Sequence, residues 1–146
     1  MVDDELISRK LSRLQGYVDE LRGATDITWE KFSTDLRARA FVERYLHLAI
    51  EEVIDTANHI VAFQRWREPA GYRDLIRILS EKGIIPEDQL STFQNMASFR
   101  NMLVHRYEVI DTELVYGIFE KHLEDFELFI SLVTRWVQAL PPGDIH

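Results

Sequence analysis

The chain has 146 residues, 46% of them hydrophobic, which is enough to bury the core of one domain that spans residues 1–146. It contains no cysteine, and this excludes a disulfide framework and any thiolate zinc site. The net charge of −8 disfavours broad electrostatic binding to nucleic acid, so any activity on RNA or DNA must depend on a local basic patch.

Two features of the sequence bear on localisation. The N-terminal run Met-Val-Asp-Asp-Glu is acidic, whereas a secretory signal peptide begins with basic residues. No uncharged apolar run approaches the roughly 20 residues that a membrane-spanning helix needs. We therefore expect a cytoplasmic protein that does not interact with membranes.

The first half of the chain predicts two helices. Apolar residues at spacings of three to five predict the first, which ends at Gly23, a residue favoured where helices terminate. A second, longer helix is expected from about Ser33 to Gln64. Pro69 and Gly71 then break the chain.

The second half predicts three further helices. A short one covers Tyr72 to Lys82 and stops at Gly83. The sequence Pro-Glu-Asp (86–88) predicts the first turn of a fourth helix, which should continue to about Arg106.

The last predicted helix has Asp111 as its N-cap, continues to Val137 and ends before Pro141 and Pro142. Six Gly and four Pro are few for a chain of β-turns, and no segment shows the alternation of a strand. The expected fold is therefore all-α, an antiparallel bundle of about five helices.

The densest group of reactive side chains lies at the end of the fourth predicted helix: Arg100, Asn101, His105, Arg106 and Tyr107. Asn101 and His105 are one turn apart on the same face, whereas Arg100 and His105 are separated by about 140° at roughly 100° per residue. One helix alone does not direct both side chains at one atom. Two copies in a symmetric dimer would place two Arg and two His around one cleft.

This group suits RNA cleavage without a metal. A neutral imidazole of His105 can accept the proton of a ribose 2′-OH, and a second, protonated imidazole can donate a proton to the leaving 5′ oxygen. Arg100 would bind the phosphate and stabilise the charge that grows on it, which gives a 2′,3′-cyclic phosphate product. Asn101 would orient the imidazole or the phosphate, and Tyr107 would stack on a base or hydrogen-bond a phosphate. The spacing alone is more typical of a histidine at the negative end of a helix and a solvated arginine than of a catalytic pair.

The segment FRNMLVHRYEVID (99–111) resembles the HepT toxins, which are HEPN-domain ribonucleases with an Arg-x4-His-x-Tyr motif. RARAFVERYLHLAIEEVIDTANHIVA (37–62) and GYRDLIRILSEKGIIP (71–86) are similar to the same family. The similarity extends in order along nearly the whole chain, which makes it far more specific than the short motif. The loop from Trp66 to Pro69 and the Pro-rich tail are less similar.

The resemblance implies a HEPN-like fold and a homodimer whose active cleft lies at the dimer interface. It implies RNA as substrate, either tRNA or mRNA, with Arg100 and His105 catalytic and Asn101 the polar residue that follows the arginine. It also implies a partner, a minimal nucleotidyltransferase antitoxin of the MntA kind, which silences the toxin by attaching AMP to Tyr107. Neither a cofactor nor a metal is expected.

Acidic and histidine side chains recur at every fourth position of the long predicted helix: Glu43, His47, Glu51, Asp55 and His59. A stripe of this kind can ligate a metal, but the Glu-x-x-His pairs of di-iron bundles are missing from it, and a period of four drifts around the helix. We favour a polar seam at a helix or subunit interface. Glu51 and Asp55 remain candidates to orient Arg100 or His105, and Arg106 is a third supporting candidate.

Several aromatic residues are at helical spacing and are expected in the core rather than as platforms for nucleic-acid bases: Trp29, Phe32, Phe41, Tyr45 and Phe93. Two alternatives to a ribonuclease remain. One is a non-catalytic helical subunit that docks on a nucleotidyltransferase or recognises its substrate. The other is a bundle that binds a metal through the stripe on the long helix.

Overall fold

The structure is a computed structural model that describes residues 3–104 and 110–141. These residues form helices and no strand, which confirms the predicted all-α fold. The elements are α1 (Asp4–Gly23), α2 (Trp29–Thr34), α3 (Leu36–Phe63), α4 (Tyr72–Glu81), the 3₁₀ turn η1 (Glu87–Gln89), α5 (Leu90–Val104), α6 (Thr112–Lys121) and α7 (Leu123–Ala139).

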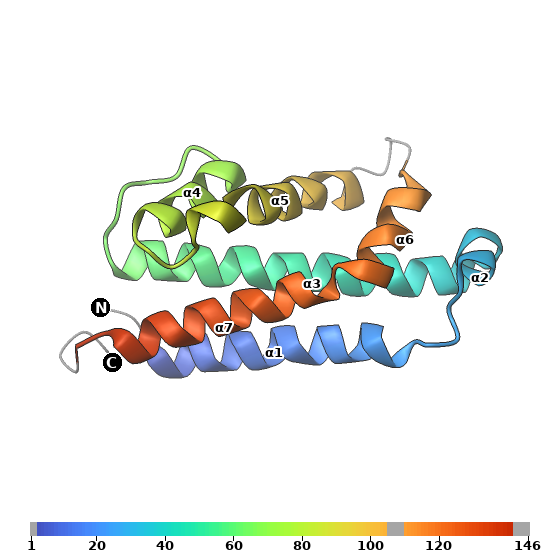
Figure 1. Ribbon diagram of the computed structural model, residues 1–146, viewed down its shortest axis with the longest axis horizontal. Helices are drawn as coiled ribbons and strands as arrows, with labels where there is room; N and C mark the ends of the chain where they lie inside the picture. Colours follow the sequence, from blue (N-terminus) through green and yellow to red (C-terminus); the bar gives the residue numbers. More distant parts are fainter. Residues whose placement is uncertain (1–2, 105–109, 142–146) are drawn as a thin grey trace.

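The long helix α3 is the centre of the bundle (Figure 1). α1 and α7 lie along one side of it, and α4 and α5 lie along the other (Figure 1). α1 and α5 run in one direction while α3 and α7 run in the other, so the bundle is antiparallel. None of the helices within the described ranges is long and apolar enough to cross a membrane.

The core is built mainly on α3, because this helix is covered on several sides and is therefore apolar around much of its surface. Leu46 and Ala57 are fully buried, and so is Leu14 of α1, which packs against α3. Burying one leucine side chain of this kind contributes about 1.5–3 kcal/mol. The buried side chains of α3 are Ala38, Val42, Leu46, Ala49, Ile50, Glu52, Val53, Ile54, Thr56, Ala57, Ile60 and Val61.

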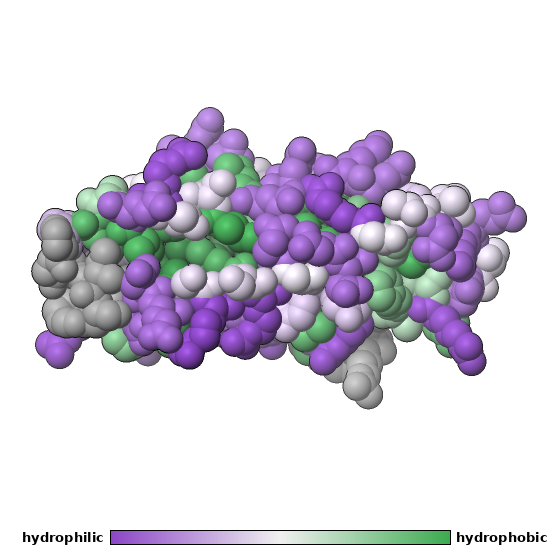
Figure 2. All heavy atoms as spheres, turned by 90° about the horizontal axis from the view of Figure 1, so that it is seen from below, coloured by the Kyte–Doolittle hydropathy of each residue, from purple (hydrophilic) through white to green (hydrophobic). Residues whose placement is uncertain are grey.

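The lower face of the molecule is formed by α1 and α7, and it shows hydrophobic side chains between hydrophilic ones (Figure 2). A groove of about 460 Å³ lies along the junction of the two helices, with Ile7 and Leu11 on one wall and Ile130 and Val137 on the other.

The predicted second helix is wrong at its start. It does not begin at Ser33, because α2 occupies Trp29–Thr34 and α3 begins at Leu36. Asp35 separates the two in an extended conformation, and its carboxylate accepts a hydrogen bond from the Arg37 N–H at 2.9 Å. Asp35 is thus an N-cap, a role that its short acceptor side chain favours over a place inside a helix.

The predicted fourth and fifth helices are also each divided. Residues 87–89 form a 3₁₀ turn before α5 instead of its first α-helical turn. The last helix breaks at His122, whose φ of −123° and ψ of 14° are not helical, so that α6 and α7 are separate. The bundle therefore has seven α-helices within the described residues rather than about five.

The aromatic side chains expected in the core are distributed unevenly. Phe32 and Phe93 are fully buried, and Phe41 and Tyr45 are half-buried against the core. The prediction is wrong for Trp29, which is 42% exposed. Its ring lies on the surface of α2 and contacts the ring of Tyr116 on α6, with the two centroids 5.4 Å apart.

Candidate functional site

The candidate site is built around Arg100, near the end of α5. This helix packs on α3 and α4 and buries Phe93, Ala97 and Phe99. Because Arg100 directly follows Phe99, the packing of α5 determines where its side chain emerges. The Arg100 side chain is 25% exposed, so it is neither a core residue nor a freely solvated one.

Glu51 of α3 binds Arg100 directly. The Arg100 Nε–H donates to Glu51 Oε1 at a distance of 2.6 Å, and the Glu51 side chain is 31% exposed. The same Oε1 lies 3.2 Å from His47 Nε2, one turn earlier on α3. The hydrogen bond and charge of Glu51, together with Tyr72, raise the pKa of Arg100 above its ordinary value, so its positive charge is permanent.

Tyr72, the first residue of α4, lies against Arg100 from another side. The Arg100 Cζ is over the Tyr72 ring, 5.3 Å from its centroid. An arginine within about 6 Å of an aromatic face is attracted by the negative potential of that face. The guanidinium therefore has an acidic partner from α3 and an aromatic partner from α4.

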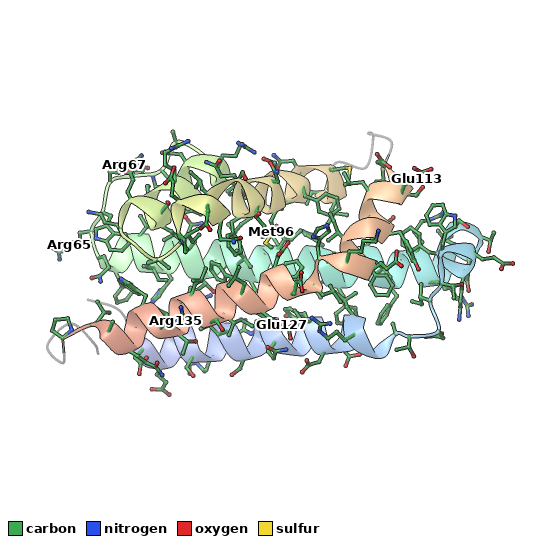
Figure 3. The ribbon with its side chains drawn as sticks, viewed as in Figure 1. Arg65, Arg67, Met96, Glu113, Glu127 and Arg135 are labelled. Atoms are coloured by element: carbon green, nitrogen blue, oxygen red, sulfur yellow. The ribbon has the colours of Figure 1, made fainter. Side chains whose placement is uncertain are left out.

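The loop before α4 is tied to the beginning of this helix. Arg67 lies on this loop (Figure 3) and donates two hydrogen bonds to Asp74, at 2.6 and 2.9 Å, and a third to Glu81 at 2.7 Å. Asp74 also accepts a hydrogen bond from the Ala70 N–H at 2.9 Å. The hydrogen bonds from Arg67 and then from the Ala70 N–H lower the pKa of Asp74 to about 2.

α4 and α5 are joined by a second set of polar contacts. Arg73 donates to Asn95 at 3.3 Å and to Ser98 at 3.1 Å. The buried Gln94 side chain donates in return to the Arg73 carbonyl at 3.0 Å. These contacts hold the first turn of α4 beside the helix that carries Arg100.

The other predicted site residues are placed differently. Asn101 is exposed next to Arg100 on α5. Asp55 is exposed one turn beyond Glu51, and its charge acts on Glu52, whose pKa is raised chiefly by burial and further by Asp55. The structure thus brings Glu51 to Arg100. The predicted residues His105, Arg106 and Tyr107 lie outside the described residues.

The acidic and histidine stripe on α3 divides between different neighbours. His47 and Glu51 join Arg100, whereas burial lowers the pKa of His59, whose ring packs on Phe63 with centroids 4.3 Å apart. Over residues 3–104 and 110–141, no three His, Asp or Glu side chains gather as ligands for a metal ion.

Sequence reasoning did not identify Tyr72 or Arg73 as part of this region. Their only signal was their position directly after Gly71, within a segment similar to the HepT family. His47 was noticed as a member of the stripe but not as a neighbour of Arg100.

The fold and the site together define a class: an all-α bundle protein in which an arginine of α5 is held between an acidic side chain of α3 and an aromatic side chain of α4. Comparison with known families makes this specific. The model of the family described as "Ribonuclease HepT-like" matches residues 14–133, so the chain belongs to this family.

Two named relatives are similar to the chain over most of their own length. The chain is 31% identical over 103 residues to the mRNA nuclease HepT of Shewanella oneidensis, which covers 70% of this chain and 77% of that protein. It is 21% identical over 140 residues to the tRNA nuclease HepT of Aphanizomenon flos-aquae, which covers 95% of each. A solved structure of the tri-AMPylated Shewanella oneidensis HEPN toxin in complex with the MNT antitoxin superposes with a TM-score of 0.82. That match has 26% identity and covers 90% of this chain and 98% of the toxin.

Proposed function

We propose that this protein is the toxin of a toxin–antitoxin pair, a metal-independent endoribonuclease that cleaves tRNA or mRNA in the cytoplasm. The observation that carries the proposal is the fixed position of Arg100, the first residue of the Arg-x4-His-x-Tyr motif, between Glu51 and Tyr72. An arginine held in this way is prepared to bind a phosphate without reorganisation. The nuclease names of the HepT relatives support the same activity.

The proposed reaction uses Arg100, Asn101 and His105. The His105 imidazole removes the proton from a ribose 2′-OH, and the 2′ oxygen attacks the adjacent phosphorus. The bond from phosphorus to the 5′ oxygen breaks, and a protonated imidazole donates a proton to this leaving oxygen. Arg100 stabilises the charge on the phosphate oxygens, while Asn101 orients the imidazole or the phosphate. The products are a 2′,3′-cyclic phosphate and a 5′-hydroxyl.

A homodimer supplies the second imidazole. Arg100 and His105 are separated by about 140° around an ideal helix, so two copies of the motif complete the reaction more readily than one. Arg106 lies next to His105 in the sequence and adds positive charge for RNA. Within an acidic chain, this local charge is what attracts the substrate.

The proposed regulator is a minimal nucleotidyltransferase antitoxin of the MntA kind. It would attach AMP to Tyr107, two residues after His105, and thereby introduce a bulky anion beside the catalytic residues. The complex of the Shewanella oneidensis toxin with its MNT antitoxin, in which the toxin is tri-AMPylated, supports this proposal.

A second candidate function is a non-catalytic subunit that docks on a nucleotidyltransferase or recognises its substrate. The net charge of −8 favours it, because a negative chain reduces the electrostatic attraction of RNA.

Expression in cells that lack the antitoxin distinguishes the two functions. We expect the wild-type protein to arrest growth and to fragment RNA, and the His105→Ala variant to be folded, equally abundant and harmless. If both proteins leave RNA intact and behave alike, the ribonuclease proposal is wrong and the docking function replaces it.

A further inference from the structure

We propose that Tyr72 is a positioning residue, which fixes the plane of the Arg100 guanidinium through its ring face while Glu51 holds the Nε edge. The inference rests on the proposed function, because it assigns the oriented guanidinium to a phosphate of RNA. It extends the site from the motif helix α5 to the first turn of α4.

Glu51 and Tyr72 restrain different movements of the Arg100 guanidinium. Glu51 accepts from Nε, at 2.6 Å, and so prevents the guanidinium from swinging away from α3. A single hydrogen bond of this kind still permits rotation about its own axis. The Tyr72 ring, 5.3 Å from Cζ, opposes that rotation, because the negative face of the ring attracts the guanidinium and the ring occupies the space on that side.

Because Glu51 occupies the Nε–H group of Arg100, a phosphate must bind to the remaining N–H groups. A guanidinium has five N–H groups in a rigid fork, and the bond to Glu51 uses the one at Nε. The four N–H groups of Nη1 and Nη2 form the end of the fork that binds two phosphate oxygens at once. The plane of the guanidinium fixes the direction of these four N–H groups. By restraining that plane, Tyr72 determines where the bound phosphate lies relative to the attacking 2′ oxygen.

Tyr72 can restrain the guanidinium because hydrogen bonds of neighbouring residues fix the backbone on both sides of it. Arg67 joins the preceding loop to Asp74, and Asp74 accepts from the Ala70 N–H, two residues before Tyr72. On its other side, Arg73 donates to Ser98 of α5 at 3.1 Å. The ring is thus presented by a turn that is attached to both the loop and the motif helix.

The test compares Tyr72→Phe, which keeps the ring, with Tyr72→Leu, which keeps an apolar side chain but removes the aromatic face. Tyr17→Leu is the matched control, because Tyr17 is also half-buried but contacts Tyr45 between α1 and α3. Each purified protein is assayed for kcat and KM on a defined RNA oligonucleotide, with helicity and Tm measured by circular dichroism.

We expect Tyr72→Leu to lower kcat by about 2- to 30-fold with little change in KM. The loss falls on kcat because an oriented donor matters most where charge grows in the transition state. Tyr72→Phe and Tyr17→Leu should stay within about twofold of the wild type. A folded Tyr72→Leu variant with wild-type kcat would overturn the inference, and so would an equal loss in Tyr72→Phe.

A second measurement decides the inference without reference to catalysis. The Nε–H resonance of Arg100, identified by its loss in Arg100→Lys, reports solvent exchange and rotation of the guanidinium in NMR spectra. We expect Tyr72→Leu to accelerate both, and Tyr72→Phe to leave both unchanged. If the wild-type protein cuts no RNA while these resonances respond as expected, the function is wrong and the positioning is right. If the wild-type protein cuts RNA and the resonances do not respond, the positioning is wrong alone.

Discussion

The Glu51–Arg100 pair has an interaction energy that can be worked out from its surroundings. Hydrogen bonds to charged groups contribute about 1.5–3 kcal/mol when protected from solvent, and exposed ion pairs only about 0.2–1 kcal/mol. The two side chains are 31% and 25% exposed, and their contact is a close one at 2.6 Å. We therefore expect an interaction energy between these limits, about 1–2 kcal/mol.

A double-mutant cycle measures this energy. The free energies of unfolding of the wild type, Glu51→Ala, Arg100→Ala and the double variant are obtained from urea denaturation followed by circular dichroism. The cycle cancels the contact of Glu51 with His47, because that contact is lost equally with and without Arg100.

The pair Glu5–Arg9 on α1 provides the control cycle. Its charged atoms are 4.0 Å apart and its side chains are 83% and 63% exposed, so its interaction energy should be below about 0.5 kcal/mol. If the Glu51–Arg100 value is no larger than that of the control, Glu51 does not hold Arg100, and the argument for a preorganised arginine fails.

Three further predictions concern stability and are measured by urea unfolding. Burial lowers the pKa of His59, with Lys10 adding to the effect and Asp3 opposing it. The folded state therefore binds fewer protons, and stability falls as the pH drops below 6.5, by at most about 1.4 kcal/mol per pH unit. His59→Gln should remove this decrease in stability below pH 6.5. An unchanged pH profile would show that His59 does not cause the decrease. Asp35→Ala removes the N-cap of α3 and should cost about 1 kcal/mol, whereas Asp35→Asn should cost little. Leu46→Ala opens a cavity in the core beside the middle of α3 and should lower the free energy of unfolding by about 2–5 kcal/mol. A smaller decrease would show that the neighbouring side chains move in to fill the cavity.

The parts of the fold that the sequence predicts well are those with local signals. The end of α1 at Gly23 and the stop after α4 at Gly83 are marked by glycine, and Gly83 has the positive φ of 81° that favours this residue. The break at His122 has no Gly or Pro to mark it, so the periodicity of α6 and α7 was read as continuous. The capping role of Asp35 is local, through the Arg37 N–H, but the apolar periodicity gives no sign that α2 ends at Thr34 just before it.

The difference between local signals and tertiary packing also explains which site residues the sequence predicts. Arg100 was identified because the motif is contiguous in sequence. Its partner Glu51 is 49 residues away and was identified only as one of several acids on a stripe. Tyr72 was not identified, because only the packing of α4 on α5 brings its ring to Arg100. Local spacing therefore predicts candidate reactive residues, and tertiary packing determines which side chains contact Arg100.

Cleavage of RNA by the purified protein tests the central claim most directly. A 5′-labelled RNA is incubated with wild-type protein and with Arg100→Ala, in the presence of EDTA, and the products are examined for their 3′ ends. We expect the wild type to yield fragments with 2′,3′-cyclic phosphates and Arg100→Ala to be at least about 100-fold slower. Equal cleavage by both proteins, or none by the wild type, would contradict the central claim.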